Sequence, residues 1–232
     1  MMRQVILDTE TTGIFIESGN RIIEIGCVEI IDRKFTGNEF QTFFNPERAS
    51  EPGALKVHGR NEQFLSDKPK FIEIYEDFLN FIKGAELLIH NAEFDIGHLN
   101  NELKINGIST TIEEHAGKIT DTLALARQMH PGQRNSLDVL TTRYMIQGYD
   151  RTYHGALLDS KILGEVFLAM TGGQTKLSFN EAIEAEEKTL KDNFKNNSTS
   201  IFAIKASNED ETAHKEYLNR IKPKLTLSLI HI

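Results

Sequence analysis

The 232-residue chain contains no tryptophan, only one cysteine, and no apolar run near the roughly 20 residues that span a bilayer. A lone thiol, Cys27, cannot form an internal disulfide, so we expect it to be a small buried residue in a strand. The opening segment MMRQVILDTE carries charges where a secretory signal would be apolar. These absences exclude a disulfide-built secreted domain and a membrane-spanning chain, and they predict a cytoplasmic protein.

An excess of positive charge is also missing. The net charge is −8, from 26 Lys and Arg against 34 Asp and Glu, and residues 171–232 hold nine of each sign. The acidic excess therefore belongs to residues 1–170, with 17 basic and 25 acidic side chains. Because nucleic-acid phosphates are normally contacted by Lys and Arg, such a domain is a poor free-standing nucleic-acid binder. It could still act on nucleic acid if cations neutralise its site and a partner delivers the strand.

Hydrophobic periodicity predicts an α/β domain. Strands are expected over 4–9, 21–32, 39–46, 85–90 and 118–122, with a hairpin turn at Gly37-Asn38 that makes the second and third strands antiparallel. Helices are expected over 69–83, 94–107, 123–130, 135–146 and 154–170. Strands followed by alternating strands and helices predict one mixed sheet covered by helices on both faces.

Two carboxylates stand at the end of the first strand, in VILDTETTG (5–13). Residues two apart on a strand point to the same face, so Asp8 and Glu10 are expected side by side, on the face opposite Val5 and Leu7. Two such charges repel unless a cation lies between them or one is protonated. A strand end that simply reaches solvent explains the same pattern.

Further chemistry-bearing residues follow at sheet ends and helix starts, where α/β folds collect ligands. Asp95 follows a buried strand, Asp159 lies early in the last helix, and His154 comes five residues before it. Carboxylates gathered there would suit Mg²⁺ or Mn²⁺, and a histidine could take a proton from water. Taken singly, Asp95 could be a helix N-cap, Asp159 a solvated residue and His154 a cap or a packed side chain.

Three segments in chain order, LDTETTG (7–13), IHNAEFDIG (89–97) and HGALLDSKIL (154–163), resemble the motifs of the histidine-bearing DEDD exonucleases. The stretches RIIEIG, VHG, DTLALAR, PGQRNSLDVL and AMTGGQT narrow this resemblance to the proofreading epsilon subunits of bacterial DNA polymerase III, over residues 3–180. The resemblance implies a ribonuclease H-like fold. It also implies a 3′–5′ exonuclease that acts on a single-stranded or frayed 3′ DNA end.

The resemblance assigns roles to five residues. Asp8, Glu10 and Asp159 match direct ligands of two divalent cations, Mg²⁺ or Mn²⁺, with Asp8 bridging both. Asp95 matches a carboxylate that reaches a metal through water, and His154 matches the general base.

The same resemblance places several residues next to the substrate: Asp8, Glu10, Gly53, His58, Phe94 and Asp159. His58 matches a contact to the terminal nucleotide, and Phe94 a residue that packs on its sugar or base. Gly53 departs from the family, because the corresponding position in a well-known relative is Glu. Only a main-chain contact to the nucleotide is expected from it.

Two other functions are also compatible with this sequence. The superfamily also contains stand-alone exoribonucleases, which are typically dimers with basic patches and without a tail like this one. A non-catalytic structural subunit of a replication complex would be expected to lack a motif carboxylate, and none is missing here.

The composition of the chain changes after the helix predicted over 154–170, toward glycine, asparagine and charged residues. We expect an exonuclease domain over 1–172, a flexible linker over 173–200 and a polymerase-docking segment over 201–232. The linker contains QTKLSF (174–179), in which Gln174, Leu177 and Phe179 resemble the anchors of sliding-clamp-binding peptides; a plain polar linker is the alternative. Asn208 with Glu211 predicts a helix start, and a stripe through Tyr217 and Leu218 would dock on the polymerase alpha subunit. A small accessory subunit is a further partner in the family, and residues 225–232 match nothing in it.

Overall fold

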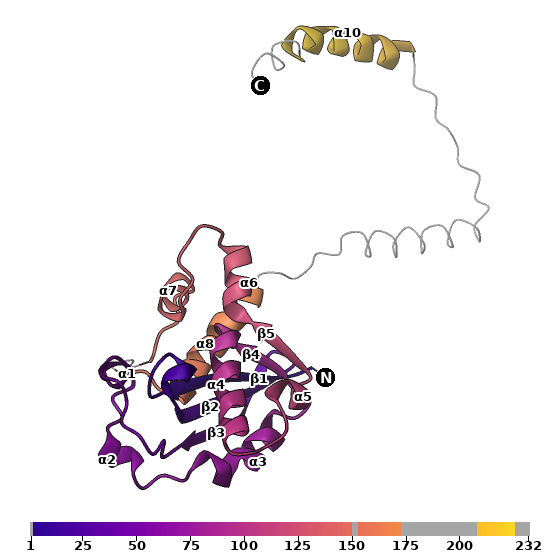
Figure 1. Ribbon diagram of the computed structural model, residues 1–232. Helices are drawn as coiled ribbons and strands as arrows, with labels where there is room; N and C mark the ends of the chain where they lie inside the picture. The colour runs from indigo at the N-terminus through magenta and orange to yellow at the C-terminus, as the bar shows by residue number, and fades with distance from the viewer. Residues whose placement is uncertain (1, 150–152, 173–207, 226–232) are drawn as a thin grey trace, which may run out of the picture. The chain divides into compact units, whose positions relative to one another are not determined.

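The computed structural model describes residues 2–149, 153–172 and 208–225 (Figure 1). Its sheet has the strand order β3-β2-β1-β4-β5. The strands are β1 (Arg3–Thr11), β2 (Ile22–Ile31), β3 (Lys34–Phe43), β4 (Glu86–Ile89) and β5 (Lys118–Asp121). The first three are antiparallel neighbours, whereas β4 pairs in parallel with β1 and β5 in parallel with β4. The predicted mixed sheet is confirmed.

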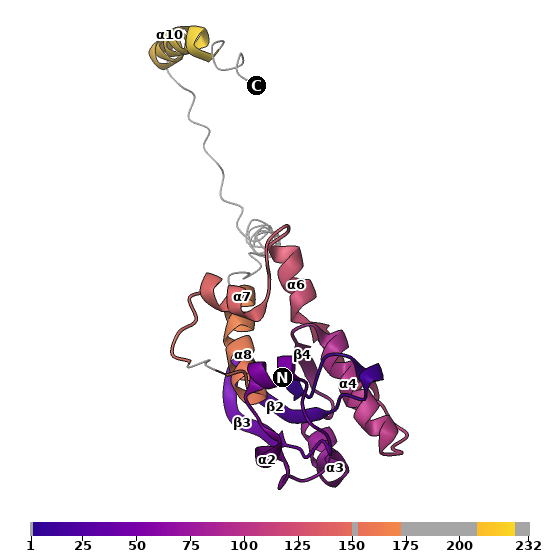
Figure 2. The ribbon, with the colours of Figure 1, turned by 60° about the vertical axis from the view of Figure 1, so that its left-hand side comes forward.

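Helices cover both faces of the sheet, with α4 and α8 on opposite sides in Figure 2. One layer holds α3 (Phe71–Ile82), α4 (Ala92–Ile105) and α5 (Ile112–His115), packed on Val5 and Leu7. The other holds α6 (Thr122–Met129), α7 (Leu137–Arg143) and α8 (Ala156–Gly172), packed on Ile6. Successive side chains along β1 therefore pack into two separate hydrophobic cores, one on each face of the sheet. Shorter helices lie in the connections: η1 (Ile16–Ser18), α1 (Pro52–His58) and α2 (Glu62–Leu65).

The hairpin between β2 and β3 turns earlier than predicted. Its turn is made by Asp32 and Arg33, which have φ values of 48° and 66°, and β3 starts at Lys34 rather than at 39. Two consecutive left-handed residues match the twist of the flanking strands, so no glycine is needed there. The turn predicted at Gly37-Asn38 is wrong: these residues lie within β3, and Gly37 has a φ of 82°. The antiparallel pairing of the two strands is nevertheless confirmed.

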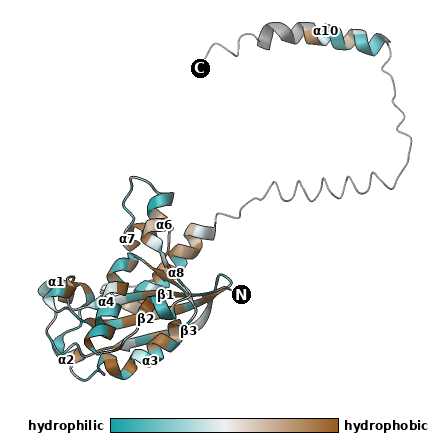
Figure 3. Ribbon diagram, turned by 45° about the vertical axis from the view of Figure 1, so that its right-hand side comes forward, coloured by the Kyte–Doolittle hydropathy of each residue, from teal (hydrophilic) through white to brown (hydrophobic). Residues whose placement is uncertain are grey.

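The chain divides into two compact units, residues 1–175 and 176–232. In the second unit the structure describes α10 (Asn208–Leu225), which begins at the asparagine that the sequence indicated. Tyr217 and Leu218 on this helix are 61% and 39% exposed, and Figure 3 shows hydrophobic and hydrophilic residues along it. The predicted linker and QTKLSF lie outside the described residues, so the proposed division of the tail stays a prediction. Within the described part of the chain, no helix is long and apolar enough to cross a membrane.

Candidate active site

The carboxyl end of β1 presents Asp8 and Glu10 on the α8 face of the sheet. Opposite them on β2 lie Gly26 and Glu24, respectively. Ile6, two residues before Asp8, packs with α8, whereas Val5 and Leu7 pack in the other core. The same-face arrangement predicted from the two-residue period is confirmed.

Glu10 lies close to His154 and Asp159, which follow it by more than 140 residues in the sequence. One ligand atom each of Glu10, His154 and Asp159 lies within 4.8 Å of the others. His154 Nδ1 is 3.0 Å from Asp159 Oδ2, and the His154 main-chain N–H donates to the Val57 carbonyl. Asp159 is buried, whereas the His154 side chain is 37% exposed. The two carboxylates are oxygen donors that fit a hard divalent cation, and an accessible imidazole lies beside them. Asp8 and Asp95 do not belong to this close group.

Asp95 approaches the site from the other side of β1. Thr9 Oγ1 donates a 2.7 Å hydrogen bond to Asp95 Oδ1. Burial raises the pKa of Asp95 to about 7, although the hydrogen bonds with Thr9 act to lower it. A nearby cation would favour the charged carboxylate. The N-cap of α4 is Asn91, so the alternative reading of Asp95 as that cap is wrong.

The first turn of α8 lies directly on β2, which places Asp159 beside β1. A Cβ atom on Gly26 would fall 2.1 Å from the Leu157 nitrogen, so this approach requires glycine. Ser160 Oγ donates a 2.8 Å hydrogen bond to the Gly26 carbonyl. Because Gly26 pairs with Asp8, the helix is fixed against the strand position that carries the first motif carboxylate.

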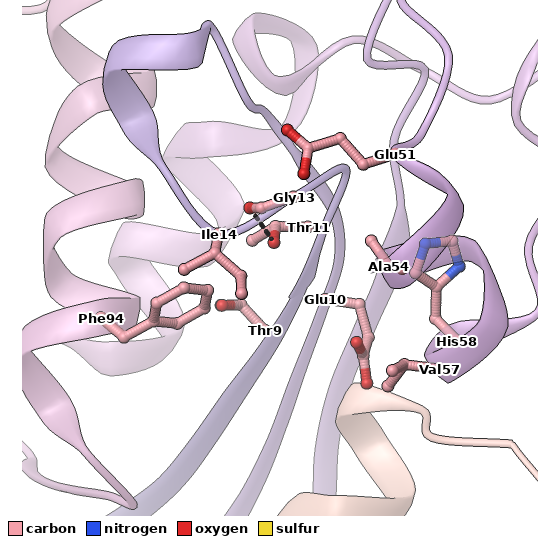
Figure 4. Close-up of a pocket in the computed structure, with 11 residues that line it drawn as sticks. Thr9, Glu10, Thr11, Gly13, Ile14, Glu51, Ala54, Val57, His58 and Phe94 are labelled. Carbon is pink, nitrogen blue, oxygen red and sulfur yellow. Dashed lines mark hydrogen bonds between the residues drawn. The ribbon is translucent and has the colours of Figure 1, made fainter.

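A pocket of about 350 Å³ opens beside Glu10 (Figure 4). In Figure 4, Phe94 and Ile14 lie on one side of the pocket, and Ala54, Val57 and His58 of α1 on the other. The lining residues are Thr9, Glu10, Thr11, Gly13, Ile14, Glu51, Gly53, Ala54, Val57, His58 and Phe94. The structure thus brings the sequence-indicated Gly53, His58 and Phe94 together with Glu10. Gln174, Leu177 and Phe179 lie outside the described residues.

His58 presents a hydrogen-bond donor at this pocket. Its Nδ1 accepts a 2.9 Å hydrogen bond from the Arg60 main-chain N–H. Burial, followed by the charge of Arg60, lowers the pKa of His58 to about 4, so the ring is neutral at pH 7. A neutral ring that accepts at Nδ1 carries its proton on Nε2. Nε2 is buried and has no hydrogen-bond partner among the described residues, which leaves an unsatisfied donor in the wall of the pocket.

The neutral state of His58 predicts a pH-dependent stability. Its folded pKa of about 4 lies below the ordinary 6.5, so its contribution is complete above pH 6.5 and is lost as the pH falls toward 4. Between pH 7 and 4.5, the metal-free parent is expected to lose about 2–4 °C more of Tm than His58→Gln, a modest difference because the ring borders an open pocket. Thermal denaturation followed by circular dichroism measures it. Parallel Tm curves for the two proteins would contradict the neutral assignment.

Several residues that line the pocket were not predicted from the sequence, among them Thr9, Ile14 and Glu51. Thr9 had a signal, because the two-residue period points it away from Asp8 and Glu10, toward the helix that carries Asp95. Ile14 follows the glycine that ends the first motif, and its 66% exposure was not visible in the sequence pattern. Glu51 is held at the pocket by its main chain, because its N–H donates a hydrogen bond to the Thr12 carbonyl. No periodic pattern marks that contact.

The sequence matches both a family model and individual known proteins. The family model described as an exonuclease matches residues 5–167. The DNA polymerase III subunit epsilon of Salmonella typhimurium is 45% identical over 96% of this chain and 94% of its own length. The chain belongs to the exonuclease family, as an epsilon subunit of the DNA polymerase III type. It is a 3′–5′ exonuclease of the proofreading kind.

Solved structures agree with this membership. Exonuclease X in complex with 5′ overhanging duplex DNA superimposes with a TM-score of 0.54 and 25% identity, over 74% of this chain and 92% of that one. Escherichia coli exonuclease I in complex with a dT13 oligonucleotide gives a TM-score of 0.64 at 16% identity, over 78% of this chain and 43% of that one. The second likeness shows the fold alone. The ribonuclease H-like fold implied by the motifs is confirmed.

Proposed function

We propose that this epsilon-type subunit removes mispaired nucleotides one at a time from the 3′ end of a DNA primer and releases nucleoside 5′-monophosphates. The observation that supports it is the convergence of Glu10, His154 and Asp159 within 4.8 Å, next to a pocket of about 350 Å³ that Glu10 also lines. Hydrolysis needs a proton acceptor and anionic groups that hold cations at the phosphate. Both are present at the same edge of the sheet.

In this mechanism the carboxylates of Asp8, Glu10 and Asp159 would hold two divalent cations, Mg²⁺ or Mn²⁺, and Asp95 would act through water. Once bound, the cations would supply the positive charge that favours ionisation of water and steadies the leaving oxygen. His154 takes the proton of the attacking water, since its ring is accessible and already lies beside Asp159.

The pocket orients the terminal nucleotide. Phe94 and Ile14 offer an apolar surface for its base or sugar, and His58 Nε2–H donates to one of its oxygens. Gly53 lines the same pocket, and nothing lies within 4 Å of the place where a Cβ would stand. A main-chain contact is the one interaction with the nucleotide that this residue offers. The selection of mispaired ends would follow from their easier fraying into single strand and not from reading of the base edges.

A primer-cleavage assay tests this function. The purified chain is incubated with a 5′-labelled primer whose 3′ end is either mispaired or paired, with Mg²⁺, with Mn²⁺ or with EDTA. We expect stepwise shortening, release of 5′-monophosphates, faster removal of the mispaired end and no reaction in EDTA. An RNA primer of the same sequence separates this function from an exoribonuclease. No cleavage of any strand would favour a structural subunit.

The tail would connect this domain to its partners. We infer that residues 201–232 dock on the polymerase alpha subunit, since Tyr217 and Leu218 of α10 are exposed and apolar. An acidic catalytic domain needs such a partner, because it has few basic residues with which to hold DNA itself. The segment 174–179 is proposed to bind the sliding clamp. A small accessory subunit on the catalytic domain would be an additional partner.

Replacing both Leu177 and Phe179 by alanine is expected to weaken clamp binding at least about a hundredfold. Each side chain contributes roughly 1.5–3 kcal/mol when fully buried, and 1.4 kcal/mol is a factor of ten. Titration of the purified clamp against both proteins measures the change. Exonuclease activity on free primers should be unaffected.

The matched control for this pair is Thr175→Ala with Ser178→Ala, which changes the same segment but keeps both apolar anchors. It is expected to bind the clamp like the parent. Equal affinities of all three proteins would leave residues 174–179 as a plain linker.

A further inference from the structure

Glu24 is a buried carboxylate to which the proposed hydrolysis assigns no role. It lies on β2 directly opposite Glu10 and is completely buried, with an exposed fraction of 0%. Directly opposite residues of an antiparallel pair point to the same face, with Cβ atoms about 4.5–5.5 Å apart. Glu24 therefore shares the α8 face with Glu10. A fifth carboxylate this close to the metal-binding group costs free energy unless it is compensated.

The compensation comes from three other segments. Gln41 Nε2 of β3 donates a 2.8 Å hydrogen bond to Glu24 Oε1. Burial raises the pKa of Glu24, and the Gln41 hydrogen bond, the main-chain N–H groups of Ala156 and Leu157 and the charge of Arg60 oppose this rise. Oε2 has no partner in hydrogen-bond geometry among the described residues, so these N–H groups act as nearby dipoles.

Those N–H groups belong to the first turn of α8. The first N–H groups of a helix have no partner within the helix, and a negative charge beside them is favourable. A Cβ on Gly155 would stand 3.7 Å from Glu24 Oε2 and 3.9 Å from an Arg60 guanidinium nitrogen, so this residue packs on the buried cluster. The residue before it is His154. Glu24 thus faces the turn between the proton acceptor and the helix that carries Asp159.

Two contacts of the neighbouring Gly26 also hold the first turn of α8 against β2. Gly26, two residues along β2 from Glu24, admits the Leu157 main chain at contact distance, and its carbonyl accepts the Ser160 hydroxyl. β2 therefore holds the first turn of α8 at two alternating positions, one opposite Glu10 and one opposite Asp8. The van der Waals contact at Gly26 fixes the distance between strand and helix. A side-chain oxygen of Glu24 faces the first main-chain N–H groups of the helix.

We propose that Glu24 is a positioning residue of the nuclease, which holds the turn at residues 154–157 so that His154 and Asp159 meet Glu10. The proposal rests on the hydrolysis proposed above. It makes Glu24 neither a metal ligand nor a proton acceptor. Its effect reaches the reacting atoms through the main chain of α8.

Glu24→Ala is expected to lower kcat on a mispaired primer about 10- to 100-fold, because misplacement of catalytic groups by around 1 Å has effects of this size. KM for the primer should change little, since the pocket at Phe94 and His58 does not involve Glu24. Mn²⁺ binding without DNA, measured by calorimetry, should weaken because Asp159 is displaced.

Glu24→Gln separates positioning from charge. Its amide oxygen can face Ala156 and Leu157 while its nitrogen donates to Gln41, so it should restore kcat and Mn²⁺ binding to within about threefold of the parent. If Glu24 instead acted on the metal by its charge or as a ligand, the glutamine variant would be as impaired as the alanine variant. That result would overturn the proposal.

Glu29→Ala is the matched control. Glu29 is also a buried carboxylate on β2, paired with Arg3, but it lies five residues from Glu24, roughly 17 Å along the strand. Its loss should lower Tm and leave kcat, Mn²⁺ binding and the pH profile of the folded protein unchanged. Parent-like kcat and Mn²⁺ binding in Glu24→Ala, at a temperature where it is folded, would refute the positioning role.

Gln41→Ala provides a second route if Glu24→Ala does not fold. Gln41 is exposed on the edge strand, so its removal should not unfold the domain, yet it releases Glu24 Oε1. It should lower kcat and Mn²⁺ affinity a few-fold, and unchanged values would count against the proposal. If the parent releases no mononucleotide at all, the proposed hydrolysis fails, whereas Mn²⁺ binding by the parent and the variants still tests the positioning.

Discussion

Replacing Asp159 or Asp8 by alanine is expected to abolish nuclease activity, by at least about 10³-fold. Cations held by these carboxylates would supply several kcal/mol of charge stabilisation, and each ~1.36 kcal/mol is tenfold in rate. The fold should remain intact. Without metal, either variant should be as stable as the parent or slightly more stable, because one of several crowded negative charges is removed. Release of monophosphate from a mispaired primer at saturating Mg²⁺, together with Tm in EDTA, measures both effects.

Asp138→Ala is the control for these substitutions. Asp138 is an acidic residue in the first turn of α7, outside the close group of Glu10, His154 and Asp159. Its activity should equal that of the parent, and its Tm in EDTA should not rise. Near-normal activity of Asp8→Ala or Asp159→Ala at saturating Mg²⁺ would contradict the two-cation assignment.

His154→Ala should keep metal and DNA binding but slow hydrolysis by about 10²–10⁴-fold, the usual size of a general-base effect. Parent activity should rise with pH, because only the neutral ring accepts a proton. The variant should lack this rise. Single-turnover rates across pH 5.5–8.5, with Mn²⁺ binding measured in parallel, distinguish loss of the base from loss of the metal.

His130→Ala is the matched control for the base. Its ring contacts Tyr144 between α6 and α7, and it does not line the pocket. Its pH profile should follow that of the parent. A flat profile in both the parent and His154→Ala would assign the proton transfer to another group.

Local patterns in the sequence determined where the strands and helices lie and which of them carry the candidate catalytic residues. A two-residue period was enough to place Asp8 and Glu10 on one face, because side-chain alternation is a property of the strand itself. Apolar spacing gave the helices that became α3, α4 and α8, since a helix repeats its face within a few residues. The motif resemblance, and not the spacing, joined Asp95 and Asp159 to that pair as one site.

Tertiary structure decided the features that depend on contacts between distant parts of the chain. The hydrogen bond from Thr9 to Asp95 joins residues 86 apart, and that from Ser160 to Gly26 joins residues 134 apart. The hairpin turn fell at Asp32-Arg33, because the cross-strand pairing of β2 from Glu24 to Ile31 fixed the register against the Gly37-Asn38 signal. Burial made His58 neutral and left Glu24 against the start of α8. Desolvation and charge at a site are set by what packs around it, and neither is a property of the residue's own neighbours in sequence.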